Sequence, residues 1–303
     1  MQWFFIALIN PIAHAFANHI DKYMISRYIK GGAVGALILF SSLFAIIALP
    51  IIFFLHPAVF TISAIKILAL MANGALLVLA IIFYFYALDL DEASTVTPLF
   101  QIVPVFGFIF GYFILGETLS AMQILGALFI IVGGVILSLK ISEQKFKLNK
   151  KLIVLMIVSS LFYALNGVIF KSIAINQGFL GSLFWDMSGK LIFGVFIFIF
   201  IKSYRKQFIE VIKENRFSVI ALGFLTEALA TIGEVALVLA VLFAPVALVQ
   251  SVASLQPLFV FIIGILITLF FPKFGRESLD KKSILKKIIG IIIITLGIFA
   301  ISI

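Results

Sequence analysis

A chain of 303 residues that is 64% hydrophobic and only 12% charged has too little polar surface to cover a water-soluble globule. The complete absence of cysteine excludes disulfides, cysteine-ligated zinc clusters and cysteine nucleophiles. The formal net charge of +9 would favour nucleic acid as the partner of a soluble protein, but in so apolar a chain it indicates basic loops against anionic lipid headgroups. We therefore predict an integral membrane protein with no nucleic-acid partner.

Apolar runs of about 20 residues, long enough to cross a hydrocarbon core as helices, follow one another along the whole chain. They are separated by charged residues or by Pro and Gly, beginning with the charged stretch from Asp21 onwards. Ten runs are predicted as transmembrane helices: 3–22, 32–55, 65–87, 94–115, 120–139, 152–173, 179–201, 217–243, 246–271 and 284–303. The predicted fold class is accordingly an all-α integral membrane protein with ten transmembrane helices.

Polar residues of the first run follow a helical pattern. Asn10, His14 and Asn18 recur at four-residue spacing, so they share a stripe that a lipid-facing helix would not carry. This stripe favours a place on a substrate pathway, where His14 can shuttle protons near physiological pH. A hydrogen-bonded, purely structural histidine is the alternative.

Amide side chains interrupt four of the later runs, where a substrate or a neighbouring helix has to satisfy them. We expect substrate contacts or interhelical hydrogen bonds from Asn73, Gln101, Asn166 and Gln250. Prolines stand close to the two glutamines and predict kinks in both of their runs: Pro98, Pro104 and Pro257.

Ionisable residues within 179–201 and 217–243 give the strongest functional signal, because a charge inside a span costs roughly 3 kcal/mol or more. Asp186 and Lys190 stand four residues apart, so they either form an ion pair along one helix face or contact substrate. Glu227 and Glu234 are seven residues apart and lie on one face of their helix. In a polar cavity these carboxylates would bind and release protons during a transport cycle; structural hydrogen bonding is the alternative.

The second half of the sequence repeats the first. PVFGFIFGYFI from Pro104 aligns with PLFVFIIGILI from Pro257, and Gly126 and Gly133 correspond to Gly290 and Gly297. Lys22 likewise corresponds to Lys171; a matched lysine pair favours an anionic substrate, with membrane anchoring as the alternative. Because five helices per copy is an odd number, the second copy must enter the membrane inverted. We predict two inverted repeats, residues 1–140 and 152–303, joined by a basic linker at 141–151.

The stretch GETLS (Gly116 to Ser120), followed by Gln123, Gly126 and Gly133, resembles the EamA-type members of the drug/metabolite transporter superfamily. The resemblance covers essentially the whole chain. It implies two five-helix halves, with helices 1, 3, 4, 6, 8 and 9 around a central cavity and helices 5 and 10 as scaffold. The second copy departs from the motif, because it reads Gly-Arg-Glu-Ser and has Lys287 where the first copy has Gln123. The motif indicates architecture and leaves the substrate open.

Basic residues are divided unequally between the two sets of loops. Lys and Arg number 19 in the loops after the first, fifth, seventh and ninth runs, against Lys66 and Lys171 on the other side. This asymmetry predicts that the basic side is cytoplasmic and that both termini lie outside, whereas members of the resembled family usually have their termini inside. The expected location is the inner membrane of the cell.

These features predict a secondary active transporter, acting as an exporter, for small polar metabolites, amino acids or drug-like compounds. Alternating access is the expected mechanism, with proton coupling through the intramembrane acids. A lipid-headgroup flippase or a membrane-embedded enzyme is the alternative, although an enzyme of this type would be expected to carry its reactive groups in a sizeable loop. No nucleotide-binding glycine loop occurs, so ATP drive is not encoded in this chain. No cofactor is expected. The protein is expected to be a monomer or homodimer.

Overall fold

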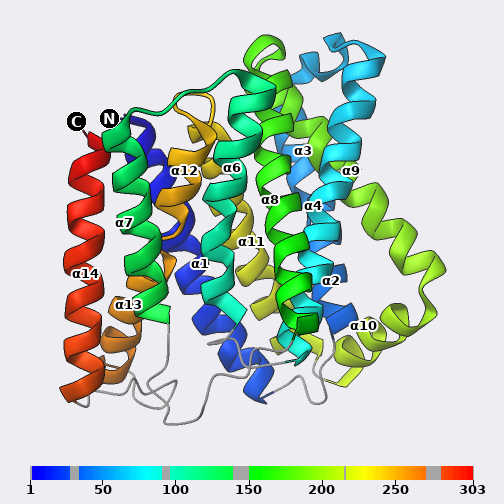
Figure 1. Ribbon diagram of the computed structural model, residues 1–303. Helices are drawn as coiled ribbons and strands as arrows, with labels where there is room; N and C mark the ends of the chain where they lie inside the picture. Colours follow the sequence, from blue (N-terminus) through cyan, green and yellow to red (C-terminus); the bar gives the residue numbers. More distant parts are fainter. Residues whose placement is uncertain are drawn as a thin grey trace.

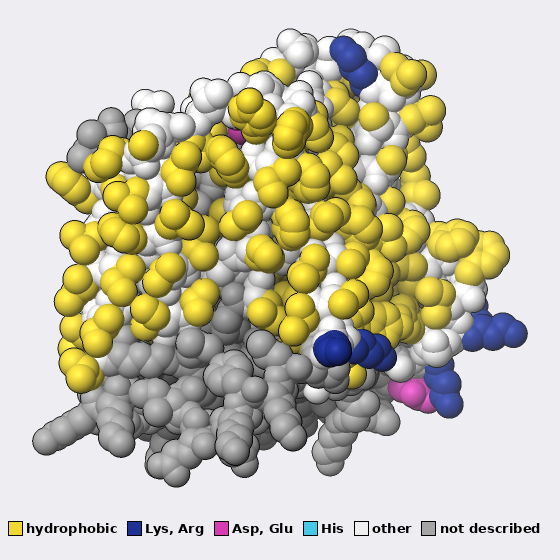
Figure 2. Space-filling view, in the orientation of Figure 1, with side chains coloured by type: hydrophobic (Ala, Val, Ile, Leu, Met, Phe, Trp, Pro, Cys, Tyr) yellow, Lys and Arg dark blue, Asp and Glu magenta, His cyan; other side chains and the backbone are white. Residues whose placement is uncertain are grey.

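The structure is a computed structural model that describes residues 2–27, 34–90, 96–138, 150–214, 216–270 and 281–302. These residues are predominantly helical and contain no β-strand. The long helices stand side by side in one bundle, and both termini lie at the same end of it (Figure 1). Apolar side chains cover most of the visible outer face (Figure 2), as expected for a helix bundle whose solvent is lipid.

Most helices begin and end close to the limits of the predicted runs, although several runs are divided into shorter helices. The first half contains α1 (Gln2–Arg27), α2 (Val34–Leu43), α3 (Ala45–Leu55), η1 (Pro57–Thr61), α4 (Ala64–Leu90), η2 (Thr97–Ile102), α6 (Val103–Phe110), η3 (Gly111–Leu115) and α7 (Ala121–Ser138). The second half contains α8 (Lys150–Gln177), α9 (Phe179–Phe200), α10 (Lys202–Glu214), α11 (Arg216–Ala240), α12 (Val246–Ala253), α13 (Gln256–Phe270) and α14 (Lys281–Ser302).

Proline and serine account for the divided runs. Run 94–115 passes from a 3₁₀ turn through an α-helix to a π-helical turn, with a proline at the start of both η2 and α6. Run 246–271 is interrupted between α12 and α13, next to Pro257, as its sequence predicted. Run 32–55 divides at Phe44, where the Ser42 hydroxyl donates to the Ile38 carbonyl at 2.7 Å, a bond that bends helices.

The helix α10 lies where the sequence predicted only a loop between the seventh and eighth spans. That prediction was wrong because it searched for apolar runs of about 20 residues, and α10 is a 13-residue helix with a charged face. Its other face is apolar and packs on α2.

Six helical segments of the described chain are long and apolar enough to cross a bilayer: Val34–Leu55, Ala64–Ala87, Lys150–Gln177, Phe179–Phe200, Phe217–Ala240 and Val246–Phe270. Three further apolar helices are shorter: Leu99–Leu115, Ala121–Ile136 and Ile288–Ile301. The chain therefore has the character of a multi-pass membrane protein.

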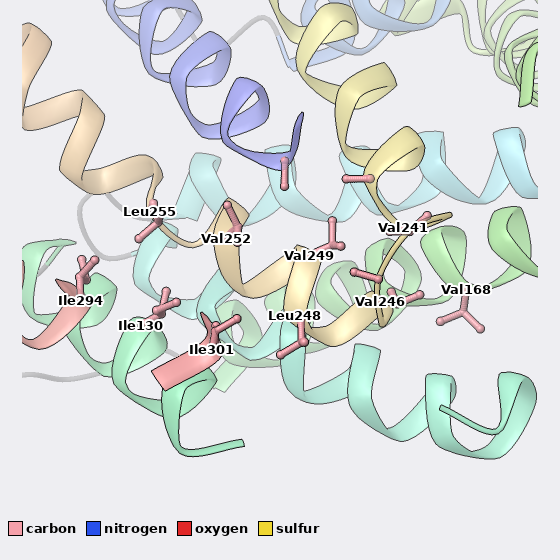
Figure 3. Packing of buried hydrophobic residues seen from close by; sticks show 13 residues of the cluster. Ile130, Val168, Val241, Val246, Leu248, Val249, Val252, Leu255, Ile294 and Ile301 are labelled. Atoms are coloured by element: carbon pink, nitrogen blue, oxygen red, sulfur yellow. The ribbon is translucent and has the colours of Figure 1, made fainter. Parts of the chain in front are cut away.

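A buried apolar core near the termini joins distant parts of the chain (Figure 3). Its members include Ala7 of α1, Ile130 of α7, Val168 of α8, Leu248 of α12 and Ile294 of α14. Since these helices come from both ends of the sequence, the core ties the two halves into one body. The polar residues described below are thereby placed between packed helices.

Helices α7 and α14 pack against each other through glycine. A Cβ atom on Gly126 would lie 2.7 Å from the Gly297 carbonyl oxygen, and one on Gly297 would lie 2.7 Å from the Gly126 carbonyl oxygen. A Cβ on Gly133 would lie 2.9 Å from the carbonyl oxygen of Gly290. Only glycine permits this separation, so α7 and α14 approach each other closely at these residues.

The GETLS segment and Gln123 form the connection between η3 and α7. Gly116 has a φ of 68°, a left-handed conformation that favours glycine and turns the chain back at the end of η3. Ser120 and Gln123 then cap α7 reciprocally: the Gln123 N–H donates to Ser120 Oγ at 3.2 Å, and the Ser120 N–H donates to Gln123 Oε1 at 3.0 Å. The motif therefore builds a turn and a helix start, and leaves Glu117 free for another contact.

Candidate functional site

A charged pair lies buried between α9 and α11. Lys190 Nζ stands 3.3 Å from Glu234 Oε2, and the two side chains are 6% and 16% exposed. An unpaired charge at this depth would be costly, so each group stabilises the other. The pair belongs to a larger polar group, which we call the Lys190 cluster, whose other members are His14, Asn73, Asn166, Asp186 and Glu227.

Asp186, one turn before Lys190 on α9, is held by α4. Asn73 Nδ2 donates to Asp186 Oδ1 at 2.7 Å. It also donates to the Asn166 carbonyl at 3.2 Å, while Asn166 Nδ2 donates to the Asn73 carbonyl at 3.1 Å. The two asparagines thus form the interhelical hydrogen bonds expected of them. Asp186 and Lys190 do not form the direct ion pair that their spacing on α9 allowed. Asn73 binds Asp186 instead, and Lys190 pairs with Glu234.

The polar stripe of α1 brings His14 to the cluster, with the backbone of Asn10 beside it. His14 lies close enough to Glu234 and Lys190 for both charges to act on it. Gly233 of α11 permits this approach, because a Cβ there would lie 3.3 Å from Asn10 Cα and 3.2 Å from the His14 ring. Asn10 is buried, whereas Asn18, two turns further along, is partly exposed.

Glu227 extends the acidic side of the cluster along α11. Its charge interacts with Lys190 and Glu234, and its carboxylate lies beside Ser41 of α2. Asp21 of α1 is a further acid whose charge acts on Glu227. Sequence reasoning assigned Asp21 to a helix end. Its place one turn beyond Asn18, on the same stripe of α1, is the signal that could have identified it.

Aromatic rings stand beside these acids. The ring centroids of Tyr84 and Phe100 are 4.8 Å apart, and those of Phe100 and Tyr163 are 5.7 Å apart with the rings at 81°. Tyr163 lies near the charges of Glu227 and Glu234. Such faces can pack on an apolar or cationic part of a ligand. In a chain with 35 Phe and 7 Tyr, the sequence pattern does not distinguish them from packing residues.

A second ion pair connects the GETLS segment to the other half of the chain. Lys171 Nζ of α8 donates to Glu117 Oε1 at 2.5 Å and to the Ala244 carbonyl at 2.7 Å. The other carboxylate oxygen, Glu117 Oε2, accepts the Val246 N–H at 2.8 Å. We call this set the Glu117 latch. It joins the end of η3, α8 and the connection between α11 and α12, at the same end of the bundle as the termini (Figure 1).

The latch changes the interpretation of the matched lysines. Lys171 is buried and paired with Glu117, so it is neither a headgroup anchor nor a free anion site in this structure. The side chain of Lys22, its counterpart, lies outside the described residues. Glu117 itself was recognised in the sequence only as part of a motif.

Gln101 and Gln250 take part in contacts between helices other than those of the Lys190 cluster. Gln250 of α12 packs against two glycines, with Oε1 over Gly107 of α6 and Nε2 next to Gly167 of α8. Gln101 of η2 packs its amide against Gly134 of α7. Both side chains are buried, and within the described residues neither Oε1 atom receives a hydrogen bond. A buried acceptor without a donor is available to a ligand or to water.

Comparison with known proteins gives a partial sequence match and a structural one. Residues 1–139 match the model of the EamA-like transporter family. No curated protein gives a significant match to the sequence. One solved crystal structure superposes with a TM-score of 0.61, covering 99% of this chain and 94% of its own, at 14% sequence identity. At that identity the likeness establishes a shared fold and nothing about substrate.

Proposed function

We propose that this protein is a secondary active transporter of the drug/metabolite transporter superfamily, and the match of residues 1–139 to the EamA-like transporter family supports this proposal. Its substrates are small polar metabolites, amino acids or drug-like compounds, which it exports across the inner membrane of the cell by alternating access. The match to a transporter family and the long apolar helices support a multi-pass membrane transporter.

The proposed architecture is ten spans in two inverted repeats. The six long apolar segments, the three shorter ones and α1 supply ten candidate spans. The contacts between α7 and α14 support a two-fold relation, since Gly126 contacts Gly297 while Gly133 contacts Gly290. In the repeat alignment Gly126 corresponds to Gly290 and Gly133 to Gly297. Such crossed contacts between corresponding residues are expected when two copies are related by a two-fold axis.

The observation that carries the proposed function is the buried Lys190–Glu234 pair between α9 and α11. Charges within spans are rare and typically mark substrate or ion pathways. The pair offers an acceptor for an ammonium group and a donor for a carboxylate about 3 Å apart. A zwitterionic substrate such as an amino acid would replace this internal pair with two external ones, which compensates the cost of separating it.

Acids outnumber bases around this pair. Asp186, Glu227 and Asp21 add three carboxylates within electrostatic range of the cluster, against Lys190 as its lysine. We propose that Glu227 and Glu234 exchange protons with the two sides of the membrane as the substrate is released. His14, next to Glu234, is placed to pass such a proton along.

The Glu117 latch supports alternating access as the mechanism. It fixes the η3 end of the first half to α8 and to the α11–α12 connection of the second half. A transporter that rocks one half against the other has to break such contacts at one end in each cycle. We propose that the latch closes the end of the bundle at which the termini lie, and that this end faces away from the cytoplasm.

The proposal is tested with the full chain in liposomes under a pH gradient. Labelled amino acids, polyamines, organic cations and organic anions are screened for uptake, with lipid movement measured in parallel as the flippase control. Glu234→Gln and Glu227→Gln should each reduce uptake by about tenfold or more and flatten its pH dependence. The matched control is Glu210→Gln, which removes an exposed acid of α10. Unchanged uptake and pH response in both cluster variants would rule out the proposed coupling.

A further inference from the structure

The position of α10 sets it apart from the other helices. It joins α9 to α11, and both neighbours have the length and apolarity of membrane spans. A helix between the ends of two spans lies at the level of the lipid headgroups. In Figure 1, α10 stands out from the side of the bundle, toward the end opposite the termini.

The inner face of α10 is fixed to the bundle. Tyr204 and Val211 are buried, and the Phe208 ring lies 4.9 Å from that of Phe40 on α2. The Gly35 N–H donates to Gln207 Oε1 at 2.9 Å, which ties the two helices together. The outer face of α10 is therefore held in one orientation before any ligand arrives.

Basic side chains border a hollow on that outer face. The hollow has a volume of about 330 Å³ and is lined by Lys202, Arg205, Lys206, Ile209, Glu210 and Lys213. Figure 2 shows dark blue side chains gathered at this corner of the molecule around one acidic group. Lys206 and Glu210 stand 3.7 Å apart but are largely exposed, so this pairing is weak and leaves the hollow positively charged.

Exposed aromatic residues flank the helix. Phe200, at the end of α9, is 66% exposed, and Phe217, near the start of α11, is 86% exposed. Cations beside exposed rings match a molecule with an anionic head and apolar tails. A free anion would use the hollow alone, whereas a phospholipid also covers the rings.

We propose that the outer face of α10 binds the headgroup of an anionic phospholipid. The phosphodiester lies in the hollow among Arg205, Lys206 and Lys213, and the acyl chains run over Phe200 and Phe217. Arginine contributes a planar pair of donors to phosphate oxygens, and lysines contribute point charges. α10 connects α9, which carries Lys190, to α11, which carries Glu234. A lipid bound to α10 therefore restrains the segment that joins these two helices. This site is separate from the proposed transport site and does not depend on it.

The test measures bound lipid by native mass spectrometry of the purified full chain, exposed to an equimolar mixture of phosphatidylglycerol and phosphatidylcholine. The variant Lys202→Gln/Lys206→Gln/Lys213→Gln removes three cations from the outer face. The control Lys66→Gln/Lys150→Gln/Lys151→Gln removes the same charge elsewhere. Wild type and control should prefer phosphatidylglycerol. The preference of the α10 variant for phosphatidylglycerol should be at least about tenfold lower than that of the wild type, since each cation near a membrane surface raises the affinity for anionic lipid about fivefold.

Three results would overturn the assignment. They are an α10 variant that keeps the wild-type preference, a control that loses as much as the α10 variant, and displacement of the lipid by inorganic phosphate at millimolar concentration. The last result would identify a site for free anions. Circular dichroism checks the fold of each variant, and if the triple variant is unfolded, Lys206→Glu alone gives the same comparison with a single change on the exposed face.

Discussion

Replacing Lys171 with Met tests the Glu117 latch, in which the carboxylate that follows η3 contacts Lys171 of α8 and Val246, the first residue of α12. The change removes the donor that lies 2.5 Å from Glu117 Oε1 and leaves that carboxylate, 14% exposed, with the Val246 N–H. The Ala244 carbonyl loses its 2.7 Å donor as well. Breaking a buried pair by removing one partner costs about 3–5 kcal/mol, so we expect a loss of unfolding free energy in that range.

A double-mutant cycle with Glu117→Gln separates the pair from the rest of the site. The variant Lys171→Met/Glu117→Gln should be more stable than the two single changes predict together, with a coupling energy of about 2 kcal/mol or more. Unfolding in detergent micelles supplies the free energies. Because the wild-type chain has no cysteine, Asn10→Cys introduces a single labelling site. Lys171→Met should speed the reaction of this cysteine with a thiol reagent added at the end of the bundle where the termini lie. A destabilisation below about 1 kcal/mol with no coupling would refute the latch.

Further substitutions at three places probe the packing of α7 on α14 and the Lys190 cluster. Gly126→Val and Gly297→Val should each destabilise the protein by about 1–3 kcal/mol and by similar amounts, because their contacts are reciprocal; tolerance of either change in a thermal unfolding assay would contradict that symmetry. Lys190→Met should cost about 3–5 kcal/mol and be partly rescued by Glu234→Gln in the same chain; no rescue would mean that the two charges are independent. Asn73→Ala should cost about 1–2 kcal/mol, and unchanged stability would show that its bonds between α4, α8 and α9 contribute little.

Helix positions were largely predictable because span length and apolarity are local properties of the sequence. The limits of α4, α8, α9 and α11 lie within a few residues of the predicted runs. The helix breaks next to proline were also predictable, since proline acts through its own backbone. By contrast, α10 was missed because its apolar and charged residues alternate around a short helix and never form a long apolar run.

The partners within the candidate site were not predictable to the same extent. Glu227 and Glu234 could be placed on one helix face from their spacing alone. The cation that pairs with Glu234 depends on how the fold places α9 relative to α11. Asp186, the acid nearest in sequence to Lys190, is bound by Asn73 of α4 instead. Glu117 pairs with a lysine 54 residues away, a contact that depends on the turn at Gly116.

A structure of the protein with a transported substrate bound, solved in lipid nanodiscs, tests the central claim most directly. We predict that the substrate lies between α9 and α11, with Lys190 and Glu234 separated and each contacting the substrate. Substrate density elsewhere, with the Lys190–Glu234 pair intact at its present 3.3 Å, would contradict the account.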